Sequence, residues 1–266
     1  MILDRATTVG IATRLATAGV PSPEADAQQL ITAAADAVQL EEWVTQRLLR
    51  VPLQHLTGRA YFRHLELHVG PGVFIPRPET ELVAQAAIDL LATLSPSVAV
   101  DLCAGSGAVA IAVATEVPGA VVHAVEQSAD ALTYLRRNVT AYAAAVDVVA
   151  GDATDPSLLP HLTGTVDVVT ANPPYIPDTM VPREPEVRDH DPDVALYGGP
   201  DGLDVARGVV STAARLLRPG SLLVMEHADV QGESVLRLFG AEWTQVVEHN
   251  DYNGLPRYVT ARKMVE

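Results

Sequence analysis

The chain has 266 residues and a single cysteine, with 48% hydrophobic and 19% charged residues, so it can bury a core but cannot build an internal disulfide framework. Its 33 acidic residues outnumber its 18 lysines and arginines, and the net charge of −15 disfavours binding to nucleic-acid phosphates. The N-terminus lacks signal-peptide features and no apolar run approaches the ~20 residues that span a bilayer, so we expect a cytoplasmic protein.

Residues 1–52 are predicted to form a small helical domain. Ser22 followed by Pro23 is typical of an N-cap and a first helical position, and it opens an alanine-rich helix that we expect to reach about Val38. A further helix is predicted over residues 40–49.

Residues 53–80 are predicted to form a linker with a β-hairpin, because residues 61–69 alternate apolar and polar side chains. The following loop, GVFIPRPETE, leads into a helix near Thr80. His64 and His68 have the spacing of metal ligands on a helix, but on a strand they lie too far apart to share a metal easily. We therefore predict no metal site.

Residues 81–266 are predicted to form an α/β domain. Short β-branched runs alternate with helical segments at 108–115 and 130–142; the runs are 98–102, 120–125, 146–150, 166–171 and 220–227. This alternation predicts a mostly parallel sheet with right-handed crossovers. Two final β-branched runs joined by the turn-like DYNGL predict an antiparallel hairpin at the sheet edge. Residues 176–202 are rich in proline and acidic side chains, and they predict a long, ordered, functional loop.

A glycine-rich loop follows the first of these strands and opens a helix. Gly105, Gly107 and Ala110 have the G-x-G-x-x-G/A spacing, which lets a ligand approach the backbone at a helix N-terminus. Glu126, about twenty residues later, is placed to accept hydrogen bonds from a ribose diol. Dinucleotides and S-adenosylmethionine both carry that ribose. Asp101 favours S-adenosylmethionine, because its carboxylate would repel a pyrophosphate and attract an ammonium and a sulfonium.

The sequence NPPY, residues 172–175, ends the fourth strand of the domain, at the edge where open α/β sheets bind ligands. The two prolines hold the Asn172 side chain and the neighbouring carbonyls in fixed directions. Asn172 Oδ1 and the Pro173 carbonyl would accept the two hydrogens of a planar amide, and Tyr175 would pack against its plane. This cradle would aim the amide nitrogen at the sulfonium methyl group without an ionisable base.

Together NPPYIP, DLCAGSG and GVFIPRPETEL resemble the N5-glutamine methyltransferases that modify peptide chain release factors, and the resemblance covers about residues 53–263. It implies a Rossmann-like, seven-stranded class I methyltransferase domain behind a small helical domain that docks the release factor. The reaction would transfer a methyl group from S-adenosyl-L-methionine, leaving S-adenosyl-L-homocysteine, to N5 of the glutamine in the factor's Gly-Gly-Gln motif. We expect a monomer with no direct nucleic-acid or membrane partner.

The resemblance also implies roles for residues of this sequence. It places cofactor contacts on Cys103, Ala104, Gly105, Ser106, Gly107, Glu126, Ala153 and Asn172. To these we add Asp101 and Asp152, which lie at or just after the ends of strands. The acceptor glutamine would contact Asn172, Pro173, Pro174, Tyr175, Arg77 and Glu79, of which Asn172, Pro173 and Tyr175 would be catalytic. Cys103 stands where glycine is commoner, which a negative φ would allow, and Ala153 stands where a larger side chain commonly packs on adenine.

Three other functions stay open. A related family methylates a glutamine of a ribosomal protein, although the segment PRPET here favours the release-factor enzymes over the PRSP of that family. Adenine-N6 DNA methyltransferases share NPPY but require a basic cleft and a target-recognition segment, against which the net charge argues. A nicotinamide oxidoreductase would carry an apolar residue in place of Asp101.

Overall fold

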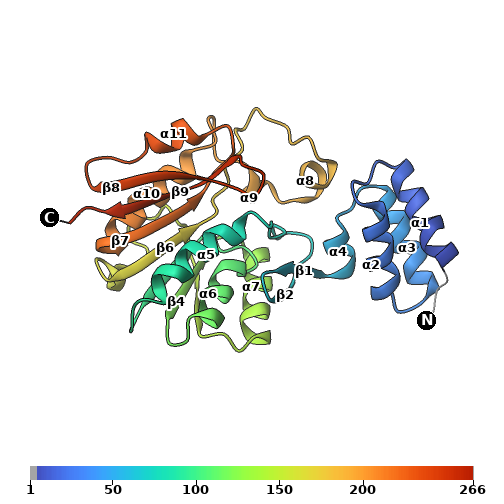
Figure 1. Cartoon of the computed structure of the whole chain (residues 1–266), viewed down its shortest axis with the longest axis horizontal. Helices are drawn as coiled ribbons and strands as arrows, with labels where there is room; N and C mark the ends of the chain where they lie inside the picture. The colour runs from blue at the N-terminus through green and yellow to red at the C-terminus, as the bar shows by residue number, and fades with distance from the viewer. Residues whose placement is uncertain (1–4, 266) are drawn as a thin grey trace.

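The computed structural model describes residues 5–265, which form a group of N-terminal helices, a two-stranded hairpin and a seven-stranded sheet covered by helices (Figure 1). The helices are α1 Arg5–Thr17, α2 Pro23–Ala33, α3 Ala37–Leu48, α4 Leu53–Thr57, α5 Thr80–Leu91, α6 Ala108–Glu116, α7 Ala129–Ala141, the 3-10 turn η1 Pro160–Leu162, α8 Pro185–His190, α9 Asp193–Leu196, α10 Asp204–Leu216 and α11 Gly232–Leu236. The strands are β1 Arg59–Phe62, β2 Leu65–His68, β3 Val98–Leu102, β4 Val121–Glu126, β5 Val146–Ala150, β6 Val166–Ala171, β7 Leu217–Glu226, β8 Trp243–Asn250 and β9 Pro256–Lys263. No helix in this described part is long and apolar enough to cross a membrane.

The large sheet has the strand order β5-β4-β3-β6-β7-β9-β8. Strands β5, β4, β3, β6 and β7 pair in parallel in that order, and β9 runs antiparallel to both of its neighbours, β7 and β8. This confirms the predicted seven-stranded, mostly parallel sheet with an antiparallel hairpin at its edge. The chain moves outward from β3 to β5 and then returns to place β6 beside β3. The loops after β3 and β6 therefore leave the sheet side by side, at the position where such sheets bind ligands.

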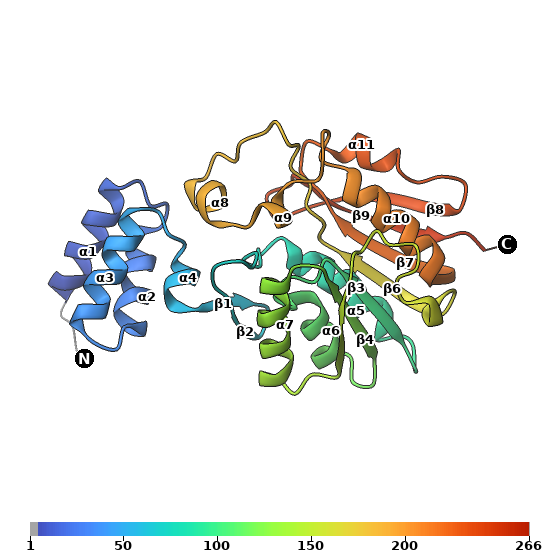
Figure 2. The same cartoon turned by 180° about the vertical axis from the view of Figure 1, so that it is seen from behind.

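The parallel strands are apolar on both faces because helices cover both faces (Figure 2). Successive residues alternate between two cores: Val168 and Val224 pack with α5, α6 and α7, whereas Val169 and Leu223 pack with α10 on the other side. This alternation follows from the two-residue period of a strand. Burial on both sides makes the strand ends rigid supports for the loops that follow them.

The N-terminal helices have an apolar core of their own, which includes Leu53 and Leu56 of α4. The predicted helix to Val38 is wrong at its end, because α2 stops at Ala33 and a new helix starts at Ala37. The Asp36 side chain accepts a hydrogen bond of 2.9 Å from the Gln39 N–H and so caps α3. The sequence analysis missed this N-cap because the surrounding residues are rich in alanine. The division of the chain at residues 52 and 80 stays a prediction.

The predicted hairpin is formed by β1 and β2, with a tight turn at Arg63, whose φ is +53°. The expectation that His64 lies on a strand with His68 is wrong, because His64 sits in this turn. Asn138 of α7 bonds both the N–H and the carbonyl of His68, at 2.8 and 3.0 Å, which fastens the hairpin to the large domain. Within residues 5–265, no group of three or more His, Cys, Asp or Glu could hold a metal ion.

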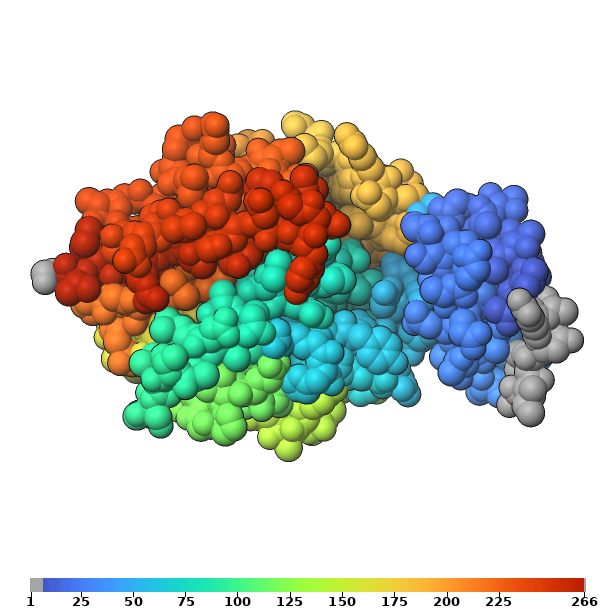
Figure 3. Space-filling model, viewed as in Figure 1, coloured from blue at the N-terminus to red at the C-terminus, as the bar shows by residue number. Residues whose placement is uncertain are grey.

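The long segment after NPPY is ordered and contains α8 and α9. Ile176 pairs with Tyr197 in a parallel bridge, which closes the segment at its base. Figure 3 shows the N-terminal helices, in blue, at one end of the molecule against the segment around α8. There Arg47 and Arg50 both donate to the Glu186 carboxylate, at 2.8 and 2.7 Å. Arg47 also donates to Asp26 at 2.8 Å, so the ion pair joins the helical core to the loop.

Replacing Glu186 by Gln should lower the free energy of unfolding by about 2 kcal/mol, because it leaves two partly buried guanidinium groups with one fewer compensating charge. Urea denaturation at pH 7 measures this change. The matched control is Glu41→Gln, which breaks the ion pair between Glu41 and Arg14. The Glu41 side chain is 60% exposed and the Arg14 side chain is 41% exposed, so this change should lower the free energy of unfolding by less than ~1 kcal/mol. Equal costs would mean that the Glu186 contact adds no more than a surface ion pair.

Candidate functional site

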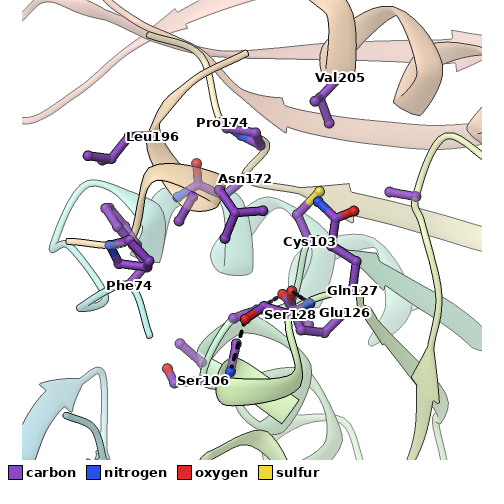
Figure 4. Close-up of a pocket in the computed structure, with 18 of the residues that line it drawn as sticks. Phe74, Cys103, Ser106, Glu126, Gln127, Ser128, Asn172, Pro174, Leu196 and Val205 are labelled. Carbon is purple, nitrogen blue, oxygen red and sulfur yellow. Dashed lines mark hydrogen bonds between the residues drawn. The ribbon is translucent and has the colours of Figure 1, made fainter. Parts of the chain in front are cut away.

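A pocket of about 1250 Å³, counting its open part, lies at the carboxyl edge of the sheet beside the loops after β3, β4 and β6 (Figure 4). Most of the predicted site residues line it: Arg77, Asp101, Cys103, Ala104, Gly105, Ser106, Glu126, Asp152, Ala153, Asn172, Pro174 and Tyr175. Gly107, Pro173 and Glu79 do not line it. The predicted residues thus meet in space, and their roles stay predictions.

The glycine-rich loop needs its glycines for two different reasons. Gly105 has φ +55°, and a Cβ built on it would meet nothing within 4 Å, so the backbone there borders open space. Gly107 has φ +88° and caps the start of α6; its Cβ would lie 2.5 Å from Leu135 Cδ1 of α7. Gly105 therefore allows a ligand to approach, whereas Gly107 allows α6 to pack against α7.

Cys103 contradicts the expectation of a negative φ, because its φ is +60°. The left-handed conformation turns the chain out of β3 so that the Ala104 N–H reaches the Val125 carbonyl, at 3.0 Å. A residue with a Cβ loses about 1–2 kcal/mol in this conformation, which explains why glycine suits the position. Burial raises the pKa of the Cys103 thiol and so disfavours the thiolate form that a nucleophile requires; the side chain packs against the core that contains α10.

Glu126 ends β4 and is 8% exposed. One carboxylate oxygen accepts from the Gly105 N–H and the other from the Ser128 N–H, both at 2.8 Å (Figure 4). These bonds fix the carboxylate between the glycine-rich loop and the start of α7. A carboxylate has about four acceptor sites, so Glu126 keeps capacity for a pair of hydroxyls.

Asp101 is 4% exposed near the end of β3. Its oxygens accept from the Thr170 hydroxyl at 2.8 Å and from the Ala110 N–H at 3.2 Å. Burial nevertheless raises the pKa of Asp101 to about 7, because these bonds compensate the lost hydration only in part. A cation in the pocket would favour the ionised form.

Asn172 is the first residue after β6, and its side chain is held from one side. Its Nδ2 donates to the Thr80 hydroxyl at 3.3 Å, and that hydroxyl donates to the buried Glu226 carboxylate at 2.7 Å. The Asn172 Oδ1 atom is left to accept from a ligand. Pro173 is buried, and its carbonyl accepts no hydrogen bond from any residue that the structure describes.

The backbone of the NPPY segment is packed against the glycines of the GGPDGL sequence. A Cβ on Gly198 would lie 2.4 Å from the Pro174 carbonyl oxygen. The Gln231 side chain donates to the Tyr175 carbonyl at 2.8 Å. The sequence analysis did not identify Gln231 or the reason for these glycines, because both act on a segment distant in the chain.

Arg77 and Glu79, which were predicted to contact the acceptor glutamine, each lie near a buried acidic residue. Arg77 donates to the buried Asp191 at 2.7 Å and lies over the Phe74 ring, 4.9 Å from its centre. Burial raises the pKa of Asp191 to about 6. Glu79 precedes α5 and lies close enough to Glu226 to raise its pKa. Pocket residues that the sequence analysis did not identify include Phe74, Ser128, Val187, Leu196 and Val205.

Comparison with known proteins identifies the family. Residues 64–182 match the Methyltransferase small domain. A protein of Streptomyces coelicolor named Release factor glutamine methyltransferase is 51% identical, over 94% of this chain and 94% of that protein. The chain belongs to the release factor glutamine methyltransferase family.

Two further proteins show how far the similarity reaches. A 4-amino-L-phenylalanine/4-methylamino-L-phenylalanine methyltransferase of Streptomyces pristinaespiralis is 44% identical over 75% of this chain and 68% of that protein. The T. thermophilus 16S rRNA N2 G1207 methyltransferase, solved with AdoMet and guanosine, is 24% identical with a TM-score of 0.55, over 77% of this chain and 49% of that one. This last likeness is one of fold, and it agrees with the class I methyltransferase fold that the family resemblance implied.

Replacing Gly198 by Ala should lower the free energy of unfolding by about 1–3 kcal/mol, since the new methyl group would collide with the backbone oxygens of Pro174 and Gly202. Gly198 has no positive φ, so the loss of stability would report the collision of the added methyl group and not backbone strain. Gly240→Ala is the control, because a Cβ there meets nothing within 4 Å; it should change stability by at most ~0.5 kcal/mol. Thermal and urea denaturation compare the two, and an unchanged Gly198→Ala variant would contradict the packing argument.

Proposed function

We propose that this protein transfers a methyl group from S-adenosyl-L-methionine to N5 of the glutamine in the Gly-Gly-Gln motif of peptide chain release factors. The observation that carries the proposal is the Asn172 amide, which is held by Thr80 and leaves Oδ1 to accept beside the pocket. Family membership at 51% identity over nearly the whole chain supports the same substrate.

The pocket residues fit S-adenosyl-L-methionine. Gly105 borders open space, Glu126 has unused acceptor sites, and Asp101 provides a carboxylate for an ammonium group. Ser106 adds a buried hydroxyl oxygen that has no hydrogen-bond partner among the described residues. A buried hydroxyl without a partner is rare in native structures, and a bound ligand would satisfy it.

The chain's own part in the reaction is to hold an amide still. When bound, S-adenosyl-L-methionine supplies the methyl group: its C–S bond breaks with the electron pair left on sulfur, while the glutamine nitrogen bonds the methyl and releases one proton. Asn172 Oδ1 accepts one amide hydrogen, and the carbonyl of Pro173, whose ring does not line the pocket but whose chain neighbours Asn172 and Pro174 do, accepts the other. Together they would keep the nitrogen aimed along the breaking bond. These acceptors bind more strongly as positive charge develops on the nitrogen, which lowers the barrier.

The partners follow from the same proposal. Residues 1–52 would dock the release factor, and the Arg47 and Arg50 contacts to Glu186 support a link between this region and the loop beside the pocket. We further propose a monomer that acts in the cytoplasm, with no nucleic acid or membrane as partner. A glutamine of a ribosomal protein and an adenine of DNA are the competing acceptors.

Incubation of this protein with S-adenosyl-L-methionine and purified release factor should add one methyl group to the Gly-Gly-Gln glutamine, as mass spectrometry of the digested factor would detect. Asn172→Ala should lower the rate about 100-fold or more, because one acceptor for the amide is lost. Asn253→Ala, at an exposed position, is the matched control and should leave the rate unchanged.

A factor carrying Gln→Ala in that motif must stay unmodified. The same assay with ribosomal proteins, DNA and free 4-amino-L-phenylalanine distinguishes the alternatives. Methylation of one of these acceptors in place of the release factor would refute the proposed substrate while leaving the cofactor proposal standing.

The affinity for S-adenosyl-L-methionine should increase as the pH rises from 6 to 8 and then level off. Asp101 has a pKa raised to about 7, so at pH 6 most of the carboxyl groups carry a proton that the cofactor's ammonium group must displace, whereas by pH 8 most are already ionised. Calorimetry at several pH values measures this dependence. Asp101→Asn should bind more weakly and lose the Asp101-linked increase, while the exposed Asp89→Asn should retain it. An unchanged increase in Asp101→Asn would contradict this role.

A further inference from the structure

A chain of hydrogen bonds connects three residues that are far apart in the sequence. Thr80 begins α5, Asn172 follows β6, and Glu226 ends β7; the Thr80 hydroxyl contacts both of the others. In the sheet register Ala171 pairs with Met225, so the next residues, Asn172 and Glu226, lie at the same level, with Glu226 still paired to Tyr258 of β9. Thr80 is 4% exposed and Glu226 is 2% exposed, so water does not compete for these bonds.

We propose that Thr80 and Glu226 are positioning residues, which determine that Asn172 presents its oxygen and not its nitrogen to the acceptor amide. This inference rests on the proposed function. A threonine hydroxyl has one hydrogen and can donate it once. Because Thr80 donates to Glu226, its oxygen faces Asn172 as an acceptor, and only the Nδ2 end of the Asn172 amide fits that contact.

The orientation matters because an asparagine side chain has two ends of similar size and opposite polarity. With Nδ2 bound to Thr80, Oδ1 is available for the hydrogens of the acceptor nitrogen. If the amide turned by half a rotation, Asn172 would present donors to an acceptor –NH2 group that is itself a donor. The acceptor would then lose one of the two contacts that hold it for transfer.

Glu226 determines the direction of these bonds because it is an acceptor when ionised. The Thr80 hydroxyl of α5 donates to its carboxyl group, and the Tyr175 hydroxyl of the NPPY segment lies close enough to lower its pKa. The charged groups that face it are Glu79 before α5 and Arg257 of β9, which have opposite effects. Burial dominates, and it raises the pKa of Glu226 to about 7.

Protonation of Glu226 would therefore reverse the chain. A protonated carboxyl group can donate to Thr80, whose own hydrogen would then point at Asn172 and favour the Oδ1 end. The amide orientation that suits transfer is stable with the carboxylate and is lost as the pH falls below about 7. The turnover rate at saturating cofactor and release factor should accordingly rise between pH 6 and 8.

The first experiment measures kcat and KM for release factor methylation by Thr80→Val, which keeps the side-chain shape and removes the hydroxyl. We expect kcat to fall about 10- to 100-fold, with the cofactor Kd and the KM for release factor within about threefold of the wild type. Thr80→Ser, which restores a hydroxyl, should recover most of the loss. Thr93→Val is the matched control at an exposed position beyond the end of α5, and it should match the wild type.

The second experiment keeps the inference testable if Thr80→Val does not fold. Glu226→Gln preserves side-chain volume but cannot ionise, so its kcat should be reduced and should lack the wild-type rise between pH 6 and 8. A purely structural role for Glu226 would lower activity without removing that rise. Melting temperatures of all variants report on folding.

Three results would overturn the inference: a Thr80→Val variant with wild-type kcat, a Thr80→Ser variant no better than Thr80→Val, or a Glu226→Gln variant that keeps the pH-dependent rise. A wild-type protein that leaves the release factor unmodified would instead refute the proposed function. The two failures are therefore distinguishable in the same assay.

Discussion

Parallel strand pairing brings three acidic side chains to one buried edge of the sheet: Asp101 near the end of β3, Glu126 at the end of β4 and Glu226 at the end of β7. An isolated carboxylate is costly to bury, so each must collect hydrogen-bond donors. Those donors come from the loops and helix starts around this edge, namely the start of α6, the glycine-rich loop, the start of α7 and the start of α5, and from Thr170 of the neighbouring strand β6. The need to satisfy these carboxylates therefore holds the loops of the pocket in one arrangement.

The same edge supports the proposed methylation of a weak nucleophile without a base. An amide nitrogen has a delocalised lone pair, and transfer depends on holding it still and stabilising developing charge. The Pro173 and Pro174 rings limit the backbone, and Gly198 and Gly202 let another loop pack directly on its carbonyl oxygens. Rigidity is thus supplied by packing and by proline, and the polar atoms need only point in the correct direction.

A second group of contacts joins the pocket to the N-terminal helices. Glu186 of α8 binds Arg47 and Arg50, while Asp191, a few residues later, binds Arg77 at the other side of the segment. Val187, which lies between Glu186 and Asp191, and Leu196, which follows Asp191, both line the pocket. A protein substrate that docks on the N-terminal helices would therefore act on the same segment that borders the acceptor site.

Short-range patterns were enough to predict the strands, the helices α5, α6 and α7 and the glycine-rich loop, because strand period, helix period and turn chemistry involve residues close together in the chain. They did not predict α8, α9, α10 or α11. They were also enough to assemble most of the pocket, since the carboxyl ends of parallel strands must converge. The left-handed Cys103, the turn at His64 and the break before Ala37 were missed, because each depends on a local backbone contact that composition does not reveal. Thr80 and Glu226 lie 146 residues apart, and only the sheet order and the packing of α5 bring them together, so their pairing has no signature in either segment alone.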